Sequence, residues 1–159
     1  MSVLDSVIRT FVFACAIMSG VLIVGIAALG FADVIGYQFF DTGVPGALEL
    51  ASKGLAAAFF LALPLAQYRR SHVDVDIVAN MLPEALQRLF GYIGLVAALA
   101  VFGVIGWQAV DLVTKSYQLS ESAQGIIPFA VWPFKTAVLV GAIGSALIAL
   151  MQILGRDAL

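Results

Sequence analysis

Charge is scarce in this sequence: charged residues make up 11% of its 159 residues, whereas hydrophobic residues make up 62%. A soluble domain is typically about 25% charged and about 45–50% apolar, so a soluble core of this size could not hide so much apolar surface. The natural solvent of the chain is therefore a lipid bilayer. A formal net charge of −2, with no basic tract, also argues against nucleic acid as a partner.

Cysteine and histidine are nearly absent, with one of each, Cys15 and His72. A single cysteine cannot form an internal disulfide. Metal sites and b-type haem sites usually need several His or Cys ligands, and these two residues are far apart in the chain. The sequence also lacks a glycine-rich phosphate loop, HExxH, CxxC and a nucleophile elbow. We therefore expect no catalytic residue, no metal or cofactor site, and no enzymatic activity.

Long apolar runs predict an all-α integral membrane protein with four transmembrane helices, since a span needs roughly 20 mostly apolar residues. The expected second span has a charge-free core, 54–68, that rises only about 22 Å at 1.5 Å per residue. The hydrocarbon layer is about 30 Å thick, so this helix must also carry Glu49 and Lys53. We expect one membrane domain, residues 1–159, with spans at about 11–32, 47–68, 89–110 and 135–154.

The first apolar run has a second interpretation, a cleaved signal peptide. Arg9 precedes the run, and Gly30-Phe31-Ala32 has the small-x-small pattern of a cleavage site. The run is nevertheless longer than the about 7–15 residues of a signal-peptide apolar region, which favours a retained membrane helix.

The basic residues predict the orientation of the chain in the membrane. Four spans place both termini on the same side as the connector 69–88, and the basic residues of that side are Arg9, Arg69, Arg70, Arg88 and Arg156. The opposite side carries Lys53, Lys115 and Lys135. The positive-inside rule therefore predicts that both termini and the connector lie in the cytoplasm.

The connector contains the densest polar segment of the chain, residues 68–76, which includes Arg69, Arg70, His72 and Asp76. Apolar residues recur beyond it at helical spacing and predict a short amphipathic helix in the membrane interface, although alternation at 73, 75 and 77 leaves its first turns open. This helix either packs on a partner or simply lies in the interface. His72 is expected to be an interfacial hydrogen-bonding residue rather than a ligand.

Two further positions are candidate sites. Glu49 and Lys53 stand at i and i+4 with the acid first, the favourable order for a helical ion pair. Ionisable residues within a membrane are also candidates for transport, a role that only Lys135 could share. The pattern favours a structural pair near the outer interface.

Trp132 is expected to anchor the start of the last span at the interface, with Pro133 in its first turn.

Small residues predict the packing faces of two spans, because they let helix backbones approach closely in lipid. They repeat every four residues along the second and fourth spans. The members of the two stripes are Gly54, Ala58, Ala62 and Ala66, and Ala137, Gly141, Ser145 and Ala149.

The order of these features resembles the small membrane subunit of tripartite ATP-independent periplasmic (TRAP) transporters, the DctQ-like family, over nearly the whole chain. The most specific segment is the basic-His-x-x-Asp pattern at 69–76, followed by Leu82-Pro83. The polar-aromatic segment 33–37, the acid Glu49 opening the second span, and 128–135 with Gly141 beyond are similar to family features. Gly36 and the lack of a tryptophan before Glu49 depart from the pattern.

The resemblance implies a function that composition alone could not supply. In such systems a periplasmic binding protein captures an organic-acid anion and delivers it to a membrane complex, whose large subunit carries the substrate and sodium sites. This chain would be a four-helix scaffold subunit in the bacterial inner membrane. The competing hypothesis is a membrane anchor for a respiratory oxidoreductase, although one histidine cannot supply bis-His haem ligation. A small exporter that uses Glu49 as proton carrier is a third, less favoured, hypothesis.

Overall fold

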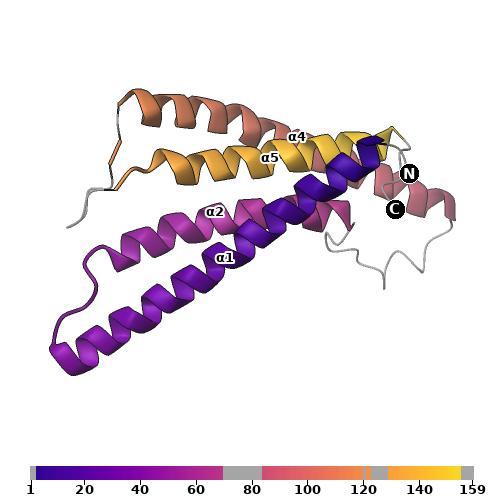
Figure 1. Ribbon diagram of the computed structural model, residues 1–159. Coiled ribbons are helices and arrows are strands. Elements are labelled where there is room, and N and C mark those ends of the chain that lie inside the picture. The colour runs from indigo at the N-terminus through magenta and orange to yellow at the C-terminus, as the bar shows by residue number, and fades with distance from the viewer. Residues whose placement is uncertain (1–2, 70–83, 120, 123–128, 155–159) are drawn as a thin grey trace.

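The computed structural model describes residues 3–69, 84–119, 121–122 and 129–154. Its helices are α1 (Val3–Phe40), α2 (Ala47–Tyr68), α4 (Glu84–Gln118) and α5 (Trp132–Ile153) (Figure 1). All four are long and apolar enough to cross a membrane. The predicted all-α membrane fold with four transmembrane helices is therefore confirmed. The predicted amphipathic helix falls in the connector, at positions outside the described residues.

Two of the helices run well beyond the spans expected from the sequence. α1 has 38 residues and continues through Asp33, and α4 has 35 residues and continues through Asp111 and Lys115. The expected spans ended at these charges because charge is costly in hydrocarbon. A helix need not end at a charged residue, however, since its backbone hydrogen bonds are made within the segment.

The helices lie in the spatial order α1, α2, α5, α4, with extended contacts between α1 and α2, α2 and α5, and α4 and α5. The central pair is therefore α2 and α5. Figure 1 shows that the α1–α2 and α4–α5 connections lie at one end of the molecule, here called the loop end. The start of α1 and the end of α5 lie at the opposite end, here called the terminal end.

Small side chains lie where α2 packs on α5 and on α1, as the sequence predicted in part. On α2, Gly54 and Ala58 are buried, whereas Ala62 is exposed. On α5, the buried face includes Gly141, Ser145 and Ala149. α1 joins this core along its first half, where the Ser19 hydroxyl donates a hydrogen bond of 2.7 Å to the Ala58 carbonyl.

A proline interrupts the hydrogen-bond ladder of α2 inside this core. Pro64 is among the fully buried side chains. A proline within a helix has no N–H for the carbonyl four residues earlier, here that of Phe60. Membrane helices tolerate this where neighbouring helices pack around the freed carbonyl.

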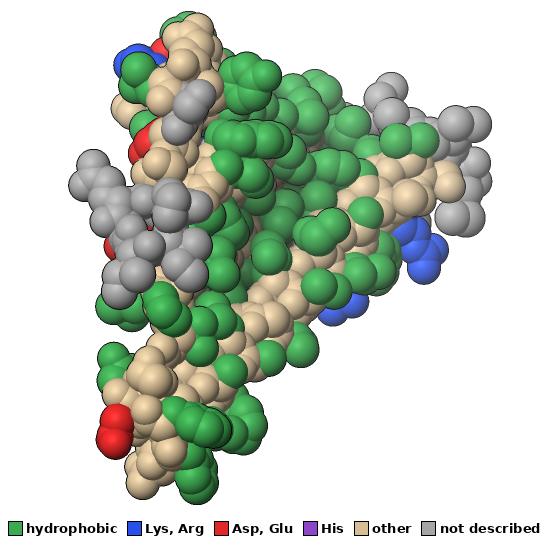
Figure 2. Space-filling model, turned by 60° about the vertical axis from the view of Figure 1, so that its left-hand side comes forward, with side chains coloured by type: hydrophobic (Ala, Val, Ile, Leu, Met, Phe, Trp, Pro, Cys, Tyr) green, Lys and Arg blue, Asp and Glu red, His purple; other side chains and the backbone are tan. Residues whose placement is uncertain are grey.

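The outer surface of the four helices is apolar. Figure 2 shows hydrophobic side chains over most of the visible face, with the few charged side chains toward its margins. A surface of this kind suits lipid or another membrane helix.

Candidate functional site

A shallow pocket of about 550 Å³ lies at the loop end, between the last turns of α1 and the first turn of α2. Asp33 and Tyr37 come from α1, residues 41–46 form the connection, and Glu49 comes from α2. The Asp33 carboxylate accepts a hydrogen bond of 2.7 Å from the Val44 backbone N–H. This bond holds the connection against the side of α1, so the pocket has a defined wall.

Close packing of this connection requires glycine at position 43. A Cβ there would lie 2.6 Å from Asp33 Oδ1 and would overlap the Tyr37 ring. The chain turns twice in the left-handed region, at Asp41 (φ 53°) and at Gly46 (φ 77°), which directly precedes α2. The sequence marked this segment as a turn, but it gave no sign that the segment folds back onto Asp33.

Glu49 faces this pocket rather than solvent or Lys53. Its Oε2 atom is buried and has no hydrogen-bond partner among the described residues. Asp33 and Asp41 line the same pocket, so three acidic side chains border it. The described part of the chain nevertheless contains no group of three His, Cys, Asp or Glu residues arranged to hold a metal ion.

The predicted ion pair between Glu49 and Lys53 is wrong for this structure. Among the described residues, ion pairs join Asp111 to Lys115 and Glu121 to Lys135. Lys53 is exposed, and its charge acts on Glu121, which follows α4. The spacing was favourable, but the two side chains turn toward different connections: Glu49 toward the α1–α2 connection and Lys53 toward the α4–α5 connection.

Lys135 instead forms an ion pair with Glu121. Its Nζ donates a hydrogen bond to Glu121 Oε2. This bond is the largest cause that lowers the pKa of Glu121, and the nearby Ser116 hydroxyl and the charge of Lys53 lower it further. The Val131 N–H also donates to the Glu121 carbonyl at 3.1 Å, which ties the start of α5 to the end of α4. Glu121 was not among the candidate residues predicted from the sequence.

Trp132 begins α5, with Pro133 in the first turn. Its ring packs edge-to-face on Tyr117 of α4, with ring centroids 6.0 Å apart, and the residue is 40% exposed. A half-exposed aromatic pair at the end of two apolar helices is typical of a membrane–water interface. The predicted anchoring role of Trp132 remains a proposal.

At the terminal end, two buried glutamines join α2 to α5. Gln67 Nε2 donates to Gln152 Oε1, and Gln152 Nε2 donates to the backbone carbonyl of Gln67, both at 2.9 Å. Neither glutamine was predicted from the sequence to form a contact, although a polar amide near the end of each of two apolar spans was a visible signal. Arg69 follows α2 directly, and its N–H donates to the Leu65 carbonyl at 3.0 Å. Arg70, His72 and Asp76 lie outside the described residues.

Several of these polar side chains join one helix to another helix or to a loop, as Ser19, Gln67, Gln152 and Lys135 do. The four apolar helices and their close packing define a multi-pass membrane protein. Residues 26–158 match the family described as "Tripartite ATP-independent periplasmic transporters, DctQ component". The chain belongs to this family and is a small membrane subunit of a TRAP transporter. A comparison with curated protein sequences found no match.

Family membership fixes the function at a coarse level. The family is a component of a tripartite transporter, alongside a large membrane subunit and a binding protein, so this chain is a transporter component. Such components are generally not enzymes. The alternative of a respiratory membrane anchor is not favoured by this match.

Proposed function

We propose that this chain is the scaffold subunit of a sodium-driven TRAP transporter that imports organic-acid anions. Its partners are a large membrane subunit, which carries the substrate and sodium sites, and a periplasmic substrate-binding protein. The observation that carries the proposal is the family match over residues 26–158. The chain performs no chemistry in this scheme and braces the large subunit in the bilayer.

The distribution of polar groups in the described helices supports a scaffold. The α2–α5 interface is filled with small residues, and its buried amides, Gln67 and Gln152, bond to each other. Substrate and ion sites of transporters are commonly formed by discontinuous helices near the bilayer midplane, with unwound backbone and facing dipoles. Each of the four described helices is continuous, and α2 remains helical through Pro64.

We further propose that the chain lies in the bacterial inner membrane with both termini in the cytoplasm. Arg69 and Arg70 then lie on the cytoplasmic side, as the positive-inside rule favours. The loop-end pocket, with Asp33, Asp41 and Glu49, then faces the periplasm, where it can help to dock the binding protein.

Reconstitution in liposomes tests this proposal. The purified chain alone should give no sodium-driven uptake of an organic acid, whereas uptake should appear when the large subunit and the binding protein are added. The chain should also copurify with the large subunit. Saturable uptake by the isolated chain would contradict the scaffold role.

A further inference from the structure

One face of α4 carries a tryptophan and an ion pair beside small apolar side chains, and it points away from the rest of the chain. Its extended contact within the described part of the chain is with α5. We call this surface the Trp107 face. Its residues recur every three or four positions, as neighbours on one side of a helix do, and all are exposed: Ala97, Ala100, Val104, Trp107, Asp111 and Lys115.

Contacts with α5 give the depth of this face in the membrane. Tyr117 packs on Trp132, where α5 begins. A Cβ on Gly106 would lie 3.4 Å from Ile143, which stands at the middle of α5. Trp107 therefore lies close to the midpoint of the span, and Asp111 lies about 9 Å along the helix from Tyr117, at 1.5 Å per residue.

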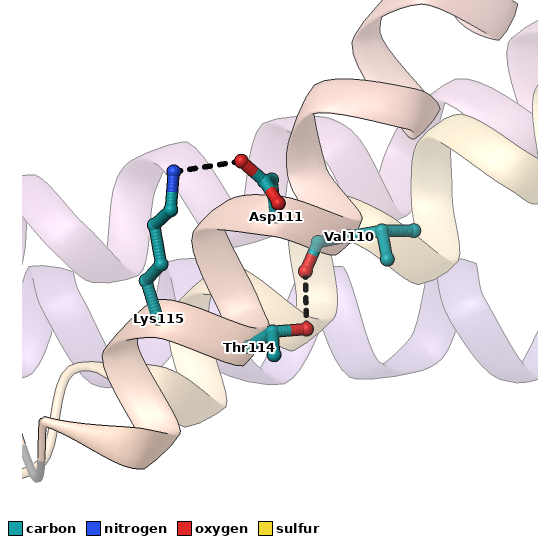
Figure 3. Close-up of polar contacts among 4 residues, drawn as sticks. All are labelled: Val110, Asp111, Thr114 and Lys115. Atoms are coloured by element: carbon teal, nitrogen blue, oxygen red, sulfur yellow. Dashed lines mark hydrogen bonds and ion pairs between the residues drawn. The ribbon is translucent and has the colours of Figure 1, made fainter.

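The side chains of Trp107 and Asp111 would be unfavourable so far inside the membrane if lipid surrounded them. Trp107 is 83% exposed, yet tryptophan in membrane proteins is enriched at the two interfaces, where its indole N–H finds partners. Asp111 and Lys115 form an ion pair of 2.7 Å, with side chains 71% and 67% exposed (Figure 3). Ionisable side chains within spans almost always face a protein interior or a water-filled cavity.

We propose that the Trp107 face is the surface on which this subunit binds a transmembrane helix of the large subunit. Ala97 and Ala100 allow a partner backbone to approach closely, and the Trp107 indole then packs against that helix. A hydrogen-bonding side chain of the partner reaches Asp111. This inference rests on the proposed function, since it takes the large subunit as the partner.

A second copy of this chain is a poorer occupant of the face. Two copies in one membrane share the same orientation, so a symmetric contact would bring Asp111 near its own equivalent at the same depth. Like charges that close together repel in a medium of low dielectric constant. A different protein can instead present a complementary group.

Site-specific photocrosslinking in the assembled complex tests the proposal. A benzoyl-phenylalanine probe is placed at Val104, which is 62% exposed, and matched probes are placed at Val24 of α1 and Phe59 of α2, which are 69% and 60% exposed. We expect the Val104 probe to crosslink to the large subunit at least tenfold more than either control. Crosslinks from Val24 or Phe59 alone, a crosslink from Val104 to a second copy of this chain, or no protein crosslink from Val104 would each overturn the proposal.

Copurification provides a second measurement and separates the two proposals. Trp107→Leu, and Asp111→Leu combined with Lys115→Leu, should each lower recovery of the large subunit at least threefold, with the thermal stability of the isolated chain retained. Phe59→Leu should leave recovery unchanged. Equal recovery for all variants would overturn the role of the Trp107 face, whereas failure of the wild-type chain to copurify would overturn the proposed function itself.

Discussion

The backbone of Gly141 lies directly against the carbonyl oxygen of Phe60, so that a Cβ at position 141 would overlap that oxygen. The carbonyl is the one that Pro64 leaves without its usual helical donor. The proline and the glycine therefore act together. Pro64 leaves the Phe60 carbonyl without its donor, and Gly141 lets the backbone of α5 pack directly against that carbonyl because it has no side chain. The sequence placed Gly141 on a packing face, but Pro64 explains why glycine is needed there.

Replacement of Gly141 by alanine should destabilise the α2–α5 interface. The backbone must move to admit the methyl group, and overpacking of this kind typically costs about 1–3 kcal/mol. Unfolding of the purified chain in detergent measures the change. Gly25→Ala is the matched control, because a Cβ at Gly25 would meet nothing within 4 Å. Equal stability of the two variants would show that the contact does not constrain the interface.

The Gln67–Gln152 contact should show strong coupling between its partners. Gln67→Leu removes the donor to Gln152 Oε1, and Gln152→Leu leaves Gln67 Nε2 without its acceptor. Each single change therefore leaves a buried polar atom unpaired, at a cost of about 1–3 kcal/mol. The double variant should cost less than the sum of the two, because it leaves no orphan amide in this contact. Detergent unfolding of the four proteins gives the coupling, and the exposed Gln108→Leu serves as control. Strict additivity would contradict an energetically important pair.

The Glu121–Lys135 pair should make stability depend on pH in the acid range. The folded structure lowers the pKa of Glu121, chiefly through the hydrogen bond from Lys135. The pair therefore contributes stability above the unfolded glutamate value of about 4.3, and this contribution is lost as pH falls through the lower folded value. Lys135→Gln should lower the melting temperature at pH 7, and its difference from wild type should shrink below about pH 4.

Arg9→Gln is the control for this experiment, because it removes an equal charge from the terminal end, far from Glu121, and Arg9 is exposed. Its effect should be small, since surface substitutions usually change stability by less than about 0.5 kcal/mol. A Lys135→Gln effect that stays constant from pH 7 to pH 3 would show that the pair is not its source.

Glu49 and Lys53 should behave as independent residues. Because they are not paired in the structure, the effects of Glu49→Gln and Lys53→Met should add to within about 0.5 kcal/mol in the double variant. Assembly with the large subunit should survive Glu49→Gln, and uptake should fall only in part, because Glu49 is one of three acidic residues at the pocket proposed to dock the binding protein. Normal assembly with abolished uptake would instead place Glu49 in the transport mechanism.

Orientation is open to direct chemical labelling. On a Cys15→Ser background, Ser71→Cys should be shielded from a membrane-impermeant thiol reagent in intact cells, and Thr42→Cys should be labelled. The reverse labelling pattern would invert the proposed topology.

Replacement of Arg69 and Arg70 by Gln removes two of the five basic residues expected inside, so the fraction of correctly inserted chain should fall.

The sequence predicted the architecture well because lipid imposes a simple rule. Long apolar runs must become helices in a bilayer, and α2 and α5 follow directly from that rule. The predicted ion pair of Glu49 with Lys53 was wrong because the spacing of two residues along a helix does not show which other groups compete for them. Lys53 acts on Glu121 only because α2 packs on α5, whose start is bonded to Glu121. Such tertiary proximity has no local signature in the sequence. The fold of residues 41–46 onto Asp33 was hidden for the same reason.

Because α1 is so long, its position and tilt in the membrane depend on the thickness of the bilayer. Its 38 residues measure about 57 Å at 1.5 Å per residue, against a hydrocarbon layer of about 30 Å. Even at a tilt of 40°, the steep end of the observed range, it would span about 44 Å along the normal. Part of α1 therefore stands outside the hydrocarbon, and the exposed aromatic residues Tyr37, Phe39 and Phe40 suit its loop end to the headgroup layer. A thicker membrane would draw that aromatic tip inward and change the angle at which α1 crosses α2.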